Sequence, residues 1–159
     1  MKKSIFSILI FSVAVLIYSC GSGPSAIYVN DTIVDKTDKV EELMAKVYDF
    51  IEEDEYDNAL AYLDSVANHA KESETIIANM KYKSAEKFQQ AALEYLAMYK
   101  KAATDFRQAI KWYQSDDDDL IEKGDDLIDD FDEKTDEKLV EIQTLQVEFA
   151  KKNNFDLKY

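Results

Sequence analysis

Residues 85–113 have the sequence AEKFQQAALEYLAMYKKAATDFRQAIKWY, which predicts one long amphipathic helix. Apolar or small side chains recur in steps of four and three residues, the spacing of one helix face. This stripe consists of Ala85, Phe88, Ala92, Tyr95, Tyr99, Ala102, Phe106, Ile110 and Tyr113. Such a face can be buried only against other helices, so its aromatic rings are predicted to be core residues.

Similar stripes occur before and after this segment. They comprise Ile33, Thr37, Val40, Met44, Val47 and Ile51; a weaker set of Leu60, Leu63, Ala67, Ala70 and Ile77; and Leu120, Gly124, Leu127, Phe131, Thr135, Lys138, Ile142, Leu145 and Phe149. We therefore predict helices at about 26–54, 57–79, 84–114 and 117–152. The short connections between them imply antiparallel neighbours, so the predicted fold is all-α, an up-down-up-down antiparallel four-helix bundle.

Polar residues between the stripes suggest where the helices begin. The candidate N-caps are Asp54 or Asp57, Ser115 within a variant capping box, and Ser73 or Ser84 for a poorly marked break between residues 71 and 84.

Composition excludes several classes of function. The 159 residues suffice for one domain, and 33 acidic against 19 basic residues give a formal charge of −14, which argues against nucleic-acid binding. One Cys and one His exclude an internal disulfide and the common Cys- and His-based metal sites. A di-iron Glu-x-x-His motif fails because Val66 stands three residues before His69. We predict no catalytic residue and no cofactor, with His69 as an ordinary residue at the edge of the core.

The N-terminal residues resemble a bacterial lipoprotein signal. Lys2 and Lys3 precede an apolar run at 5–18, and Ile17-Tyr18-Ser19-Cys20 resembles the lipobox. The resemblance implies cleavage before Cys20, diacylglycerol on its sulfur, and a membrane partner reached through the lipid. An ordinary cleaved signal peptide or an N-terminal anchor helix is the alternative. The expected division is 1–19 signal peptide, 20–25 lipidated Cys and short flexible tether, and 26–159 helical domain.

A second resemblance involves both ends of the helical domain. The segments YVNDTIV (28–34), DKV (38–40) and VEFAKKNNF (147–155) together resemble a family of uncharacterised helical surface lipoproteins of bacteria. The resemblance implies an all-helical fold in the cell envelope, at the outer membrane or the cell surface, and it transfers no catalytic residue. Gly21 after Cys20, which differs from the Asp-type retention signal of inner-membrane lipoproteins, also favours the outer membrane.

The predicted topology separates charge along the bundle. The first and third turns would share the end far from the tether, which we call the acidic pole: Glu52, Glu53, Asp54, Glu55, Asp57, Asp116, Asp117, Asp118, Asp119 and Glu122. The opposite end, the basic pole, would hold Lys81, Lys83, Lys87, Lys151, Lys152 and Lys158. The acidic pole is either a docking surface for a cationic protein or divalent cations, with 116–119 as the candidate cation contact, or a solvated surface.

Two further interpretations concern the helix faces. Asp125, Asp129, Asp132 and Asp136 share one face of the last helix and are expected to face water. The alternative function is a small-ligand or divalent-cation-binding lipoprotein with a site between helices, near Tyr82, Tyr95, Tyr99 and Trp112.

Overall fold

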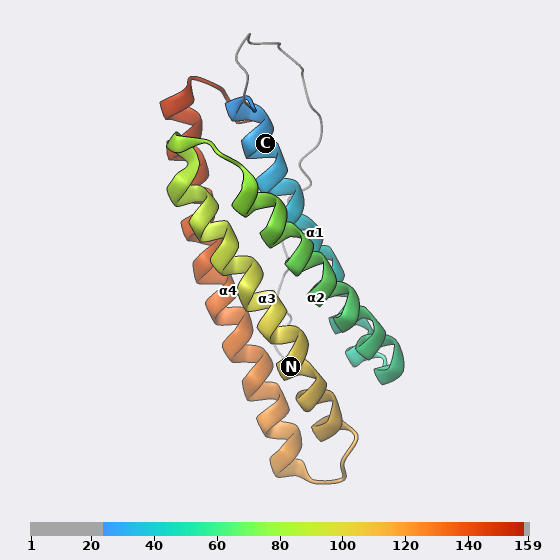
Figure 1. Ribbon diagram of the computed structural model, residues 1–159. Helices are drawn as coiled ribbons and strands as arrows, with labels where there is room; N and C mark the ends of the chain where they lie inside the picture. The colour runs from blue at the N-terminus through green and yellow to red at the C-terminus, as the bar shows by residue number, and fades with distance from the viewer. Residues whose placement is uncertain (1–23, 158–159) are drawn as a thin grey trace.

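A computed structural model describes residues 24–157 and consists of four long helices (Figure 1). They are α1 (Ala26–Glu52), α2 (Tyr56–Asn79), α3 (Glu86–Tyr113) and α4 (Asp118–Asn153), with a short 3-10 helix, η1 (Lys83–Ala85), directly before α3. The predicted signal peptide, the lipobox with Cys20, and Lys158 lie outside the described residues.

The helices form an up-down-up-down antiparallel bundle, as the sequence predicts. Each helix packs along the next one in the chain, and α3 lies between α2 and α4. The pair α1 and α4, which would close the bundle, touches far less. Figure 1 shows the α1–α2 and α3–α4 turns at one end, and the α2–α3 connection with the last turn of α4 at the other.

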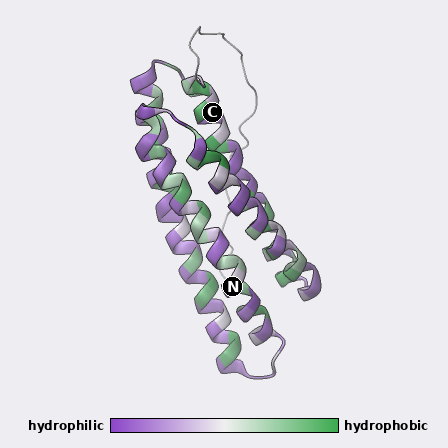
Figure 2. Ribbon diagram, viewed as in Figure 1, coloured by the Kyte–Doolittle hydropathy of each residue, from purple (hydrophilic) through white to green (hydrophobic). Residues whose placement is uncertain are grey.

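The core is built around α3, because that helix buries residues toward all three others. Its largest fully buried side chains are Phe88, Tyr95 and Phe106. The ring of Phe106 packs edge-on against Tyr48 of α1 and Phe131 of α4, with centroids 5.8 and 5.3 Å away. In Figure 2 apolar and polar residues alternate along every helix, as expected for amphipathic helices that bury one stripe.

The helix starts differ from the predicted caps. Asp54 and Asp57 do not cap α2: the N-cap position is Glu55, without a side-chain cap, and Asp54 takes a left-handed conformation with φ 57°. The α4 cap is Asp117, whose carboxylate accepts the Asp119 N–H at 3.0 Å. Ser115 instead donates its hydroxyl to the Trp112 carbonyl at 2.7 Å.

The break between α2 and α3 also lacks the predicted serine cap. Ser73 is fully buried within α2, and Ser84 lies inside η1, while α3 begins without a side-chain cap. The η1 turn replaces the cap, because its Ala85 N–H donates to the Tyr82 carbonyl at 2.9 Å and leads the chain into α3.

The end of α4 is fastened to this connection. Asn154 adopts the left-handed conformation that ends many helices, and the Phe155 N–H returns to the Ala150 carbonyl at 3.2 Å. The Asn153 side chain accepts hydrogen bonds from Tyr82 and Ser84, at 3.2 and 3.1 Å. These bonds hold the two segments of the basic pole side by side.

Candidate functional site

The acidic pole is formed by two turns at the same end of the bundle, opposite the first turn of α1 (Figure 1). All ten of its carboxylates belong to exposed residues. Among the described residues, none of them forms an ion pair with a Lys or Arg, although nine such pairs occur elsewhere on the helices. The pole therefore combines strong negative charge with carboxylates that form no ion pair within the described chain.

Local hydrogen bonds shape the two acidic turns. Tyr56 donates its hydroxyl to Asp54 at 2.8 Å, and Asn58 donates to Glu55 at 2.5 Å. In the other turn, Asp117 holds the first turn of α4, where negative charge is favourable beside the helix N-terminus. Within residues 24–157 no group of three or more His, Cys, Asp or Glu side chains is arranged to hold a metal ion. The predicted cation contact at 116–119 is therefore a charged turn without a built ligand cage.

The four aromatic residues of the alternative ligand site are spread along the bundle. Tyr82 precedes η1, where its ring meets Phe149, whereas Trp112 lies in the last turn of α3. Trp112 is about 20 Å from Tyr99 along the axis of α3, at roughly 1.5 Å per residue. Only Tyr95 and Tyr99 are brought together, with ring centroids 4.9 Å apart and both side chains buried. The four side chains thus do not line a common site.

Tyr95 and Tyr99 belong instead to a polar seam between α1, α3 and α4, which periodicity does not reveal. The Tyr95 hydroxyl donates to the Glu41 carboxylate at 2.7 Å. Since it has only one hydrogen, it accepts the hydrogen of Tyr99 at 3.1 Å. Two buried phenols from α3 thereby reach a carboxylate on α1.

A second tyrosine–carboxylate bond joins α1 directly to α4 in this seam. Tyr48 donates to Asp132 at 2.5 Å, and Asp132 is half-buried rather than directed to water as expected. The acidic stripe of α4 is therefore not a uniformly wet face. Near the start of α1 and the end of α4, the buried Gln146 amide donates to the Asn30 side chain at 3.0 Å, so polar bonds replace close apolar packing between α1 and α4.

Burial and mutual repulsion make the seam carboxylates weaker acids than usual. Burial, opposed by the Tyr95 hydrogen bond and assisted by Asp38 and Asp136, raises the pKa of Glu41 to about 7. Burial also raises the pKa of Asp38 to about 6 and shifts the pKa of Asp132 upward. The seam can therefore change its protonation near neutral pH. A sequence pattern could have hinted at it only through acids placed directly beside apolar stripe positions, as Glu41 is beside Val40.

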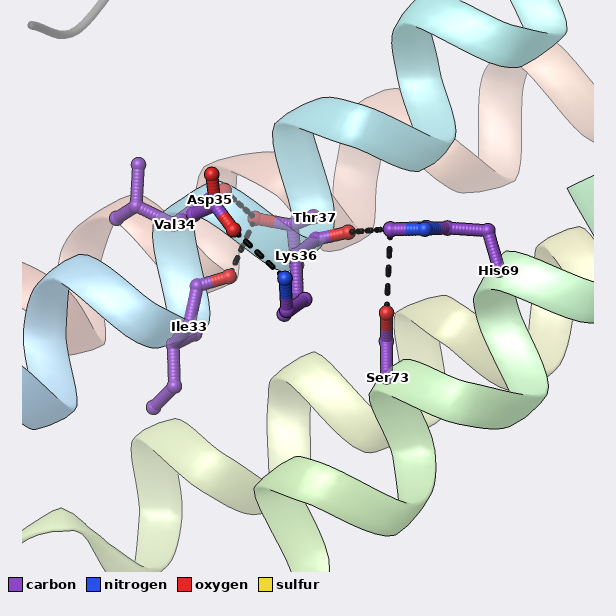
Figure 3. A network of polar contacts seen from close by, with 7 residues as sticks. All are labelled: Ile33, Val34, Asp35, Lys36, Thr37, His69 and Ser73. Carbon is purple, nitrogen blue, oxygen red and sulfur yellow. Dashed lines mark hydrogen bonds and ion pairs between the residues drawn. The ribbon is translucent and has the colours of Figure 1, made fainter.

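His69 lies in a small polar network between α1 and α2 (Figure 3). Its Nε2 atom is 3.2 Å from the Lys36 carbonyl oxygen and 3.1 Å from the Ser73 hydroxyl. A carbonyl can only accept, so the first bond requires a hydrogen on Nε2. In that tautomer Nε2 has no lone pair with which to activate Ser73, and the arrangement links two helices rather than forming a nucleophile and base.

The basic pole gathers five described lysines from the α2–α3 connection, the start of α3 and the end of α4. They are Lys81, Lys83, Lys87, Lys151 and Lys152. All are exposed, and within the described chain none forms an ion pair with an acidic side chain. A shallow depression beside Lys81, Lys83 and Gln89 adjoins them.

Comparison with known proteins returns no match: no family model, no curated protein and no solved structure is similar to this chain. Across residues 24–157, moreover, no helix combines the length and apolar character needed to cross a membrane.

Proposed function

We propose that this protein is a non-enzymatic, lipid-anchored module of the bacterial cell envelope that binds a cationic protein surface through its acidic pole. The observation that carries the proposal is the placement of two acidic turns, without ion pairs in the described chain, at one end of the bundle. The first turn of α1, which follows the predicted tether, lies at the other end. An anchor at one end and concentrated charge at the other present the acidic pole away from the lipid.

The charge pattern favours a protein partner over a metal ion. Exposed carboxylates attract a basic surface over several ångströms and speed its association, without the fixed geometry that a metal requires. The absence of a metal-holding cluster within the described residues supports this choice. The tautomer of His69 likewise supports a binding role over hydrolytic chemistry.

The test compares three forms of the full chain as bait for envelope proteins. In the first variant, Asp116→Asn, Asp117→Asn, Asp118→Asn and Asp119→Asn remove four charges from the acidic pole while leaving Asn as a good helix cap. The matched control removes four charges from the exposed side of α4 with Asp126→Asn, Asp129→Asn, Glu133→Gln and Glu137→Gln.

The proposal predicts that the wild type and the side-face control retain the same basic protein at low salt. The acidic-pole variant should lose at least about tenfold in retention, because lost charge complementarity slows encounter and weakens binding. Equal retention by all three forms would refute the docking role. The anchor is tested separately by metabolic labelling with fatty acid, which should mark the wild type and not Cys20→Ser.

A further inference from the structure

The end opposite the acidic pole has its own surface chemistry. Segments 24–31, 76–88 and 148–157 come together there and contain five lysines and four acidic residues. By contrast, segments 49–57 and 112–122 at the acidic pole contain eleven acidic residues and no Lys or Arg. The bundle therefore carries a large charge gradient along its long axis.

Most of the lysines lie at the outer end of the basic pole, together with two of the acids, Glu86 and Asp156. Lys81 and Lys83 lie in the connection that projects beyond the ends of α2 and α3, and Lys151 and Lys152 are in the last turn of α4. Of the four acids, Asp31 and Glu148 lie farther back, more than one helical turn inside α1 and α4. All five lysines are free of ion pairs within the described chain, so their charge is available to an external anion.

Exposed apolar side chains accompany these lysines. Among the described residues three large hydrophobic side chains are exposed, and two of them lie at this end: Tyr28, 58% exposed in the first turn of α1, and Ile76, 42% exposed in the last turn of α2. The third, Val140, lies about 20 Å before the end of α4 at roughly 1.5 Å per residue. Lysines beside an amphipathic aromatic ring are typical of surfaces that rest on lipid headgroups.

From this combination we propose that the basic pole docks on an anionic lipid surface and holds the bundle upright, with the acidic pole pointing away from the membrane. The lysines bind headgroup phosphates, while Tyr28 and Ile76 enter the headgroup layer. Repulsion between the lipid and the acidic pole acts in the same direction, because both are negatively charged. The inference rests on the proposed anchor only for keeping the bundle near the lipid.

The single tryptophan provides a direct measure of this orientation. Trp112 lies near the acidic pole, at the far end of α3, and a helix of 28 residues is about 42 Å long. We would reconstitute the full chain into vesicles of phosphatidylcholine with phosphatidylglycerol in equal parts, or of phosphatidylcholine alone. Energy transfer from Trp112 to a dansyl-labelled lipid then reports how closely the far end approaches the surface.

The expected result is low energy transfer on anionic vesicles and higher transfer on neutral ones. The variant Lys81→Gln, Lys83→Gln and Lys87→Gln should raise transfer on anionic vesicles by more than about twofold, since each lysine near such a surface favours contact by about fivefold. The matched control, Lys39→Gln, Lys46→Gln and Lys101→Gln, loses the same charge from exposed sites along the helix sides and should behave like the wild type. High salt should reproduce the effect of the first variant on the unmodified protein.

Equal transfer for wild type and both variants, or equal transfer on the two lipids, would overturn the inference. Salt screens the acidic pole as well as the lysines, so the lysine variant read beside its matched control decides the matter; its three sites are exposed, and circular dichroism should show an unchanged fold. Mass spectrometry of the same sample reports whether Cys20 carries lipid. An unlipidated chain that still binds anionic vesicles through its basic pole would refute the lipid anchor. The inferred orientation of the bundle on the membrane would then still hold.

Discussion

The packing around α3 is apolar, whereas the contact between α1 and α4 is made by polar side chains. Around α3, Phe106 and its neighbours are fully buried apolar groups that meet ring against ring. Between α1 and α4, contact depends on two hydrogen bonds, from Tyr48 to Asp132 and from Gln146 to Asn30, while the neighbouring Glu41 accepts from Tyr95 of α3. The apolar side supplies stability, whereas the polar seam leaves one face of the bundle looser and sensitive to protonation.

This difference follows from where α3 sits. A central helix must satisfy three neighbours, so nearly every position along its wide apolar stripe is buried. Helix α4 borders fewer partners and buries six of its 36 residues. Because α4 lies at the edge of the bundle, much of its surface remains hydrated. This position accounts both for its many charged residues and for its sparse contact with α1.

The largest expected effect on stability comes from a substitution in the apolar packing around α3. Phe106→Ala should lower the free energy of unfolding by about 3–5 kcal/mol, because it removes a buried ring and leaves a cavity between α1, α3 and α4. Val140→Ala, at a site 63% exposed, should change it by less than about 0.5 kcal/mol. Urea denaturation of both variants measures the difference. A loss of only about 1 kcal/mol for Phe106→Ala would show that the centre of the bundle is as loose as the seam.

The contribution of the polar seam to the stability of the fold should depend on pH. The pKa of Glu41 is raised from 4.5 to about 7 in the folded protein, so folding favours the protonated form. The associated stability is fully present below the unfolded pKa and is lost as pH rises from about 4.5 to about 7. Asp38, whose folded pKa is about 6, acts in the same direction.

Replacing Glu41 by a neutral isostere isolates this contribution. Glu41→Gln keeps an acceptor for Tyr95, and we expect it to stabilise the protein by about 1–2 kcal/mol at pH 8, the partial exposure of the group reducing the effect. The gain should vanish near pH 4. The control Glu137→Gln, on the exposed face of α4, should give a nearly constant small change. Thermal unfolding of both variants across this pH range provides the measurement. Parallel dependence of their stability on pH would contradict the burial of the Glu41 carboxylate.

The fold could be predicted because periodicity is a local property. Phe88, Phe106 and Ile110 lie in the predicted stripe and in the core, and the helix bounds agree with the prediction to within a few residues. The helix caps were less predictable, since several neighbouring Ser and Asp residues can each accept the same backbone N–H. Asp117, rather than Ser115, holds that position in α4.

The polar seam could not be predicted from spacing alone. Glu41 and Asp132 are acids at the borders of apolar stripes, and only the rotation of α1 and α4 about their axes determines which border meets a neighbour. Lys138 shows the converse case. It occupies a stripe position, yet its amino group forms ion pairs with Glu94 and Glu141 at the surface of α3 and α4. Both outcomes depend on packing between helices distant in sequence.

The smallest expected effect tests how closely α3 and α4 pack beside the acidic pole. A Cβ added at Gly124 would lie 2.7 Å from Cε1 of the Tyr113 ring, whose hydroxyl donates to Asp125 at 3.0 Å. Gly124→Ala gains about 1 kcal/mol of helix propensity but displaces this ring and its hydrogen bond, so the net change should be close to zero. In a Tyr113→Ala background the ring is absent, and the same substitution should stabilise by about 1 kcal/mol. An equal gain in both backgrounds, measured by urea denaturation, would mean that α3 and α4 are no closer here than α1 and α4 are along the seam.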